Sequence, residues 1–88
     1  DIPTDGDFMA YPNPANNQLT ISFSLPVADD VTITLTNILG QVVAQRNIKN
    51  EKDHKEVLNT TLLPDGMYIY NVATKNGSFT GHISVLHQ

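Results

Sequence analysis

Polar and apolar residues alternate without interruption from Gln18 to Leu25, and this pattern constrains the fold more than any other feature of the chain. The same alternation returns in residues 31–36, where threonines take the polar positions. A period of two is that of a β-strand with one buried and one solvated face. The two stretches are therefore expected to direct one set of side chains into a core: Leu19, Ile21, Phe23, Leu25, Val31, Ile33 and Leu35.

Turn signals divide the rest of the chain into further strands. Pro26 is expected to end the strand of residues 18–25, and Gly40 to supply the positive φ of a tight hairpin turn. Asn76-Gly77 is the favoured pair for a two-residue hairpin, and the charged segment 49–55 has the composition of an exposed loop. We therefore expect an all-β fold, an immunoglobulin-like β-sandwich of roughly seven short antiparallel strands. These are expected at residues 8–11, 18–25, 31–36, 41–48, 56–60, 67–74 and 79–86.

Composition narrows the domain organisation and the possible partners. The chain has 88 residues, enough for one domain, and no cysteine for a disulfide. A net charge of −4 with five scattered Lys and Arg residues argues against nucleic acid as a partner, and no apolar run is long enough for a membrane span. Residues 1–7 have linker composition, so we expect a tether to a preceding part of a longer polypeptide there and the folded domain at residues 8–88.

No combination of residues suggests an active site or a metal centre. The histidines His54, His82 and His87 lack the spacing of metal ligands, and no Gly-x-Ser-x-Gly elbow is present. We therefore expect no enzymatic activity, no cofactor and no metal. Tyr68 follows a Pro-Asp-Gly turn and is expected to form a tyrosine corner, with its phenol bonded to nearby backbone. Tyr68 and Tyr70 share one strand face, which favours the core over a sugar-binding surface.

Several motifs occur in a characteristic order along the chain: Tyr11-Pro12-Asn13-Pro14-Ala15, then residues 37–43 with Gly40, then Leu63 to Tyr68 with Gly66. In this order and spacing they resemble the C-terminal sorting domain of the type IX secretion system, from about Tyr11 to Gln88. The last strand departs from that family, which commonly ends in a lysine-bearing apolar motif. Here Ile83 and Val85 are left as the shared elements.

The resemblance implies an address label at the C-terminus of a cargo protein from Bacteroidota-type bacteria. Such a cargo passes through the periplasm and is delivered by an outer-membrane translocon to the cell surface or the medium. A sortase-like cysteine protease is then expected to cut in the linker, around Asp5, Gly6 and Asp7, and to attach the cargo to the surface. Two other interpretations stay open: a passive immunoglobulin- or fibronectin-like spacer, and a carbohydrate-binding accessory module of a secreted enzyme.

Overall fold

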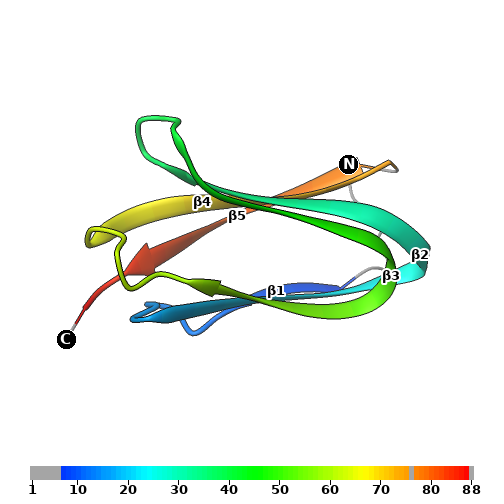
Figure 1. The fold of residues 1–88 in the computed structure, drawn as a ribbon, viewed down its shortest axis with the longest axis horizontal. Helices are drawn as coiled ribbons and strands as arrows, with labels where there is room; N and C mark the ends of the chain where they lie inside the picture. Colours follow the sequence, from blue (N-terminus) through cyan, green and yellow to red (C-terminus); the bar gives the residue numbers. More distant parts are fainter. Residues whose placement is uncertain (1–6, 76, 88) are drawn as a thin grey trace.

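The computed structural model describes residues 7–75 and 77–87, and within them every regular element is a β-strand. The five strands are β1 (Asp7–Tyr11), β2 (Gln18–Asn37), β3 (Val42–Asn59), β4 (Gly66–Thr74) and β5 (Gly77–Val85). All their pairings are antiparallel, β1 with β2, β2 with both β3 and β4, and β4 with β5. The two longest strands form one hairpin that curves over the whole molecule (Figure 1).

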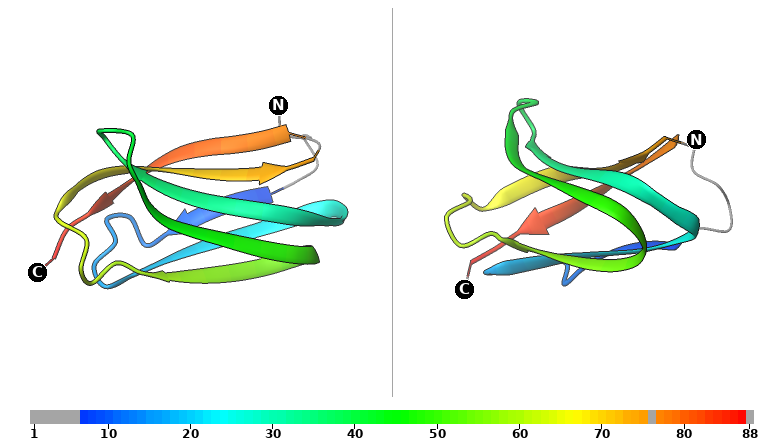
Figure 2. Two further views of the ribbon diagram at one scale, coloured as in Figure 1. Left: turned by 45° about the horizontal axis from the view of Figure 1, so that its top comes forward. Right: turned by 45° about the vertical axis from the view of Figure 1, so that its right-hand side comes forward.

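The curvature of this hairpin divides the fold into two layers. The β2–β3 ladder is interrupted between Ser24 and Asp29, and the chain bends there. One layer contains β1, the first half of β2 and the second half of β3. The other contains the first half of β3, the second half of β2, and then β4 and β5. The two layers face each other as an immunoglobulin-like sandwich, which the views in Figure 2 show from two further directions.

The predicted fold class is confirmed, although the strand count differs because two pairs of expected strands are continuous. The expected end at Pro26 is wrong, since β2 passes through this residue. Pro26 lies in the interrupted part of the ladder. No ladder hydrogen bond is needed there, so the lack of an N–H in proline is tolerated. Asp7 pairs with Ser24, so β1 begins one residue earlier than expected.

The expected loop at residues 49–55 is also wrong, because this segment belongs to β3. Glu51 pairs with Asp29, and residues 53–55 pair with residues 22–24. Side chains of β2 hold the bend: Asp30 Oδ1 accepts a hydrogen bond from Asn50 N at 3.0 Å, and Ser24 Oγ donates to Asp53 Oδ1 at 2.6 Å. The backbone of this segment is therefore paired while its charged side chains face solvent, so a highly charged segment can still form a strand.

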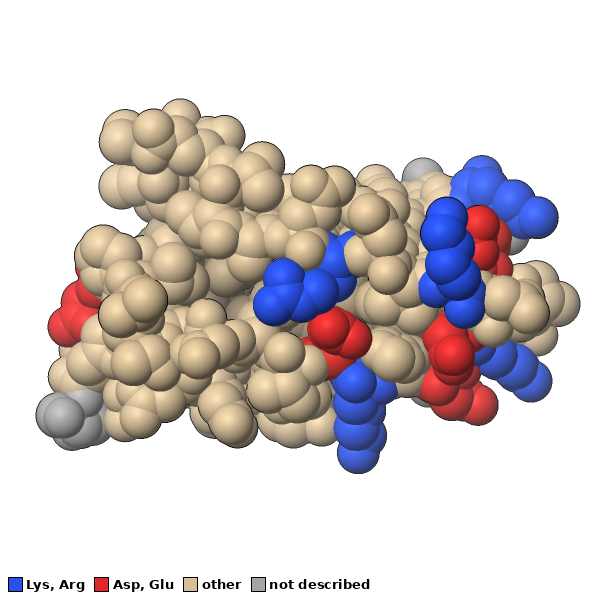
Figure 3. Space-filling view, viewed as in Figure 1, with Lys and Arg blue, Asp and Glu red and all other residues tan. Residues whose placement is uncertain are grey.

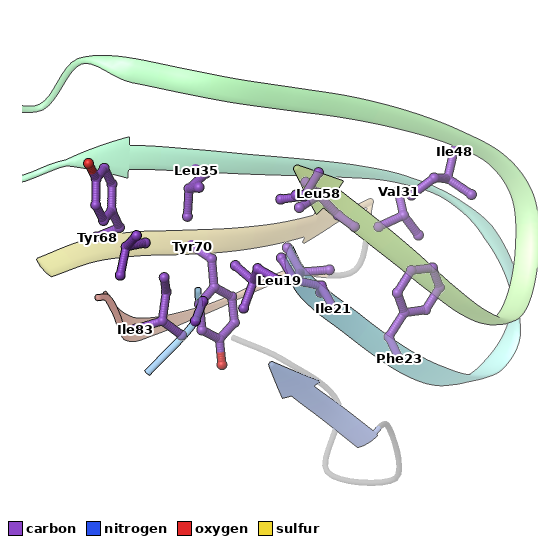
Figure 4. Packing of buried hydrophobic residues seen from close by; sticks show 14 of the residues in the cluster. Leu19, Ile21, Phe23, Val31, Leu35, Ile48, Leu58, Tyr68, Tyr70 and Ile83 are labelled. Atoms are coloured by element: carbon purple, nitrogen blue, oxygen red, sulfur yellow. The ribbon is translucent and has the colours of Figure 1, made fainter. Parts of the chain in front are cut away.

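The core lies between the layers, and the alternation read from the sequence builds it. Every inward residue expected from residues 18–25 and 31–36 is buried. Figure 4 shows these side chains meeting those of the later strands. The Phe8 and Phe79 rings stack with centroids 5.3 Å apart, so aromatic packing closes the side of the sandwich where β1 and β5 lie. The core also includes Ile48, Leu58, Tyr68, Tyr70, Val72, Ile83 and Val85.

A glycine in β5 makes room for one of these core rings. Gly81 lies opposite Tyr70 in the β4–β5 ladder, and a Cβ added at Gly81 would overlap the Tyr70 ring. Because Tyr70 is buried, its ring has little room to move away. We expect Gly81→Ala to lower the free energy of unfolding by roughly 1–3 kcal/mol.

Urea unfolding followed by circular dichroism measures this loss. Ser78→Ala is the matched control, because Ser78 is an exposed residue of the same strand. Equal stability of the two variants would contradict the proposed contact between Gly81 and the Tyr70 ring.

Candidate functional site

The three motif segments that carry the family resemblance meet at one end of the sandwich, beside the residues that follow β5. We call this the motif end and define it by four segments: residues 11–17, 37–43, 60–68 and 86–87. They contain the connections from β1 to β2, from β2 to β3 and from β3 to β4, with adjoining strand residues, and the residues that follow β5. In Figure 1 they gather on the left, around the C-terminus. The opposite, bend end contains residues 24–29, 49–53 and the hairpin that joins Thr74 to Gly77.

The proline arm at residues 11–15 is bonded to the last strand. Ala15 N donates to Ser84 O at 2.7 Å, and Leu86 N donates to Ala15 O at 2.8 Å, which makes a short parallel bridge. Asn13 Oδ1 accepts a third hydrogen bond, from Ser84 N at 3.1 Å. Ala15 is completely buried, and the two X–Pro bonds of the arm are cis. The arm is therefore bonded to the last strand and the residue after it, in addition to leading from β1 to β2.

The corner before β4 has the arrangement expected of a tyrosine corner. Tyr68 is buried, and its hydroxyl donates to Pro64 O at 2.6 Å. Gly66 has φ 153°, in the region that favours glycine. Burial, and secondarily the nearby negative charge of Asp65, raise the pKa of Tyr68 above its ordinary value. The predicted hydrogen bond from Tyr68 to the backbone is confirmed.

The tail after β5 is bonded to this corner and to the arm through His87. Its backbone N donates to Asp65 Oδ1 at 3.1 Å, and its ring Nε2 donates to Leu63 O at 2.7 Å. The other ring nitrogen lies 3.2 Å from Asn16 Oδ1. From the sequence His87 stands out only as a histidine without the spacing of a metal ligand. No local pattern reveals these contacts, because their partners lie 22 to 71 residues away.

The hairpin between β2 and β3 is held by Asn37 and presents two apolar side chains. Asn37 Oδ1 accepts hydrogen bonds from Leu39 N at 2.9 Å and Gln41 N at 3.0 Å, an arrangement typical of an Asx turn. Gly40 has φ 85°, as expected from its place in the turn. Ile38 and Leu39 are 75% and 79% exposed. The turn is therefore well ordered by hydrogen bonds, although its apolar side chains face solvent.

The structure separates the predicted recognition residues into three groups. Gly40 and Gly66 shape turns, and Leu63 is half-buried. Four residues are buried and support the fold: Ala15, Tyr68, Ile83 and Val85. Four are exposed in the arm: Tyr11, Pro12, Asn13 and Pro14. Of the predicted cleavage residues, Asp5 and Gly6 lie outside the described residues.

Neither a metal centre nor a membrane-spanning helix is present in the part of the chain that the structure describes. Residues 7–75 and 77–87 contain no group of three or more His, Asp or Glu side chains placed to hold a metal ion. Within the same ranges, no helix has the length and apolar character that crossing a membrane requires.

Comparison with known families gives one match. The family model of the secretion system C-terminal sorting domain matches residues 9–85, which span nearly the whole sandwich. The chain belongs to this family. No curated protein matches the chain. Membership of this family identifies the chain as a type IX secretion sorting domain of Bacteroidota. Such a domain interacts with the type IX secretion system and directs its protein to the cell surface or out of the cell. The family is one of sorting signals, not of enzymes.

The Tyr68 hydrogen bond gives a prediction about the stability of the sorting domain. Tyr68→Phe removes only the hydroxyl and leaves the ring in the core, so the bond to Pro64 O is lost without a large cavity. We expect the free energy of unfolding to fall by about 1 kcal/mol. Urea unfolding at neutral pH measures the loss, with Tyr11→Phe as the matched control because Tyr11 has no such bond to Pro64. A Tyr68→Phe variant as stable as the control would contradict the tyrosine corner.

The buried phenols also predict loss of stability at alkaline pH. Burial raises the pKa of both Tyr68 and Tyr70 above 10.0. A pKa raised on folding means that the native state holds its proton more tightly than the unfolded state. The resulting stabilisation is complete below about pH 10 and is lost as the pH rises further.

We therefore expect the free energy of unfolding to fall above about pH 10, and to fall less in Tyr68→Phe and least in a variant with both tyrosines replaced by phenylalanine. Urea titrations at a series of pH values between neutral and strongly alkaline measure the slopes. Identical alkaline slopes in all three proteins would show that other groups cause the loss.

Proposed function

We propose that this sorting domain is read by the outer-membrane translocon of the type IX secretion system after its cargo has entered the periplasm. The observation that carries the proposal is the family match, which covers the sandwich from β1 to β5. In this proposal residues 8–88 are the signal, and residues 1–7 are the linker to the cargo. The domain acts as an address that the machinery binds and performs no chemistry itself.

The arrangement of the predicted recognition residues supports a division of roles. The buried residues, such as Ala15 and Tyr68, are proposed to act indirectly, because a partner cannot reach them in the folded domain. The exposed prolines of the arm and the loops shaped by Gly40 and Gly66 are proposed to meet the partner. A rigid arm of this kind presents a fixed surface with little loss of conformational entropy on binding.

We further propose that a sortase-like cysteine protease removes the domain by cutting in the linker around Asp5, Gly6 and Asp7. Asp7 pairs with Ser24 at the start of β1. A cut on the N-terminal side of Asp7 leaves this pair intact, so the released domain keeps its complete first strand. The freed cargo is then attached to the cell surface or released into the medium.

The two competing functions differ in what they require of the surface. A carbohydrate-binding module needs several exposed aromatic rings, but Tyr68 and Tyr70 are buried in the core, and Tyr11 carries the one exposed Phe or Tyr ring among the described residues. A passive spacer needs only the sandwich and has no need of a partner at either end. Export of a foreign cargo therefore distinguishes a sorting signal from a spacer.

The test is a fusion of residues 1–88 behind a periplasm-targeted fluorescent reporter, expressed in a bacterium that has a type IX system. We expect the reporter to reach the surface or the medium, and mass spectrometry of the released domain to find a first residue at or before Asp7. The control replaces residues 1–88 with an unrelated immunoglobulin-like domain of similar size. Periplasmic retention of the first fusion, or equal export of both, would reject the sorting function.

Deleting the last strand is a poor test of this function. Ile83 and Val85 are buried, and β5 pairs along its whole length with β4. Removal of residues 83–88 therefore destroys the fold as well as any signal, so that loss of export has two explanations. Substitutions of exposed residues, checked for folding, avoid this ambiguity.

A further inference from the structure

We propose that the translocon docks on one apolar surface at the motif end, centred on residues 65–67 and flanked by the arm and the β2–β3 hairpin. The proposal rests on the proposed function and deepens it by naming the surface and the chemistry of the partner. Three independent features carry it: the distribution of exposed apolar side chains, the shape of the surface, and the distribution of charge.

Exposed apolar side chains are concentrated at the motif end. Among the described residues ten large apolar side chains are exposed, and seven of them belong to the four motif-end segments. These seven are Tyr11, Ile38, Leu39, Val42, Leu62, Met67 and Leu86. Apolar side chains that gather in one region of a surface mark an interaction site more often than the same number scattered singly. The motif end is therefore the region most suited to bind another protein.

The surface is hollowed on both sides of a central ridge. The ridge consists of Asp65, Gly66 and Met67. On one side, Pro14 and residues 84–86 complete a hollow of about 460 Å³. On the other side, residues 37–39, Pro64 and Tyr68 complete a hollow of about 270 Å³. Because each hollow combines segments far apart in the sequence, the surface exists only in the folded domain.

Charge is nearly absent from this surface. The four motif-end segments contain no Glu, Lys or Arg, and their one Asp is Asp65. The Asp65 side chain is 52% exposed. The lysines and the arginine lie elsewhere, in residues 46–55 and at Lys75. Figure 3 shows this segregation, with Lys and Arg in the middle and at the bend end. The complementary partner surface presents apolar side chains and one cationic group opposite Asp65.

The position of the cargo is compatible with a partner at the motif end. β1 starts at Asp7, which pairs with Ser24 beside the bend, and runs toward the motif end. In the proposed function the cargo precedes this strand and so joins the domain at the bend end. The translocon can therefore bind the motif end without displacing the cargo. A second copy of this chain is the competing occupant, and its own motif-end segments contain no Lys or Arg to pair with Asp65.

The first test replaces the two exposed residues of the hairpin. Ile38→Ser and Leu39→Ser together remove apolar surface without touching the core, and Val27→Ser, 58% exposed in the bend, is the matched control. We expect the paired substitution to lower the ratio of exported to retained reporter about tenfold, and the control to leave this ratio unchanged. Urea unfolding of the purified domains checks that the variants stay folded.

Asp65 tests the charge of the partner. Asp65→Asn keeps an oxygen that can accept the bond from His87 N, whereas Asp65→Lys also reverses the charge. We expect export to fall in the order wild type, Asp65→Asn, Asp65→Lys. Equal export of wild type and Asp65→Lys would reject a cationic partner surface.

The absence of cysteine from the chain allows a direct test of contact. Leu39→Cys and Val27→Cys, each labelled with a benzophenone maleimide, are irradiated with outer membranes from a bacterium that has the system. We expect residue 39 to cross-link to a translocon component identified by mass spectrometry, and residue 27 not to do so.

The outcomes separate this inference from the proposed function. If the wild-type fusion is exported and the paired hairpin variant is exported equally, the docking surface is wrong and the sorting function stands. Cross-links from residue 39 only to another copy of the domain, or equal translocon cross-links from residues 27 and 39, would also overturn it. If the wild-type fusion stays in the periplasm, both the sorting function and the docking surface fail.

Discussion

The hydrogen bonds between Ala15 and the end of β5 tie the proline arm to the last strand at the motif end. They join the proline arm to Ser84 and Leu86, so the two layers are linked at an edge that the β2–β3 hairpin does not reach. Because Ala15 is completely buried, its backbone groups would be costly to leave unpaired. The positions of the arm and of the tail at the motif end both depend on this short bridge.

The sequence predicts the local features of the fold well, because alternation and turn chemistry act over a few residues. The inward faces of residues 19–25, the turn at Gly40 and the Tyr68 corner all follow from such patterns. Pro26 and residues 49–55 mislead for the opposite reason. Their conformations are set by a ladder with a distant strand, which tolerates a proline at its interruption and charges on its solvated face.

The candidate site shows the same boundary between local and distant causes. The proline arm stands out in the sequence, but its bond partners at Ser84 and Leu86 do not, and neither does the bridging role of His87. No periodicity connects residues that are about seventy positions apart. What the sequence conveys is the identity of each segment, and the pairing of strands determines that these segments meet. Family membership gives a function to the domain as a whole. A role for this meeting point in recognition is our proposal.

For a partner that docks on the proposed surface, folding of the domain is a condition of recognition. One hollow is lined by Ser84, Val85 and Leu86, from β5 and the residue after it. The ridge at residues 65–67 and the β2–β3 hairpin come from other parts of the sequence. An unfolded copy of the domain contains all of these segments but does not hold them in the relative positions that form the surface. A partner that binds the assembled surface therefore selects the folded domain by its own affinity, since binding to the unfolded chain would have to overcome the entropy of ordering all four segments. In the proposed function the small core therefore supports export by keeping these loops together.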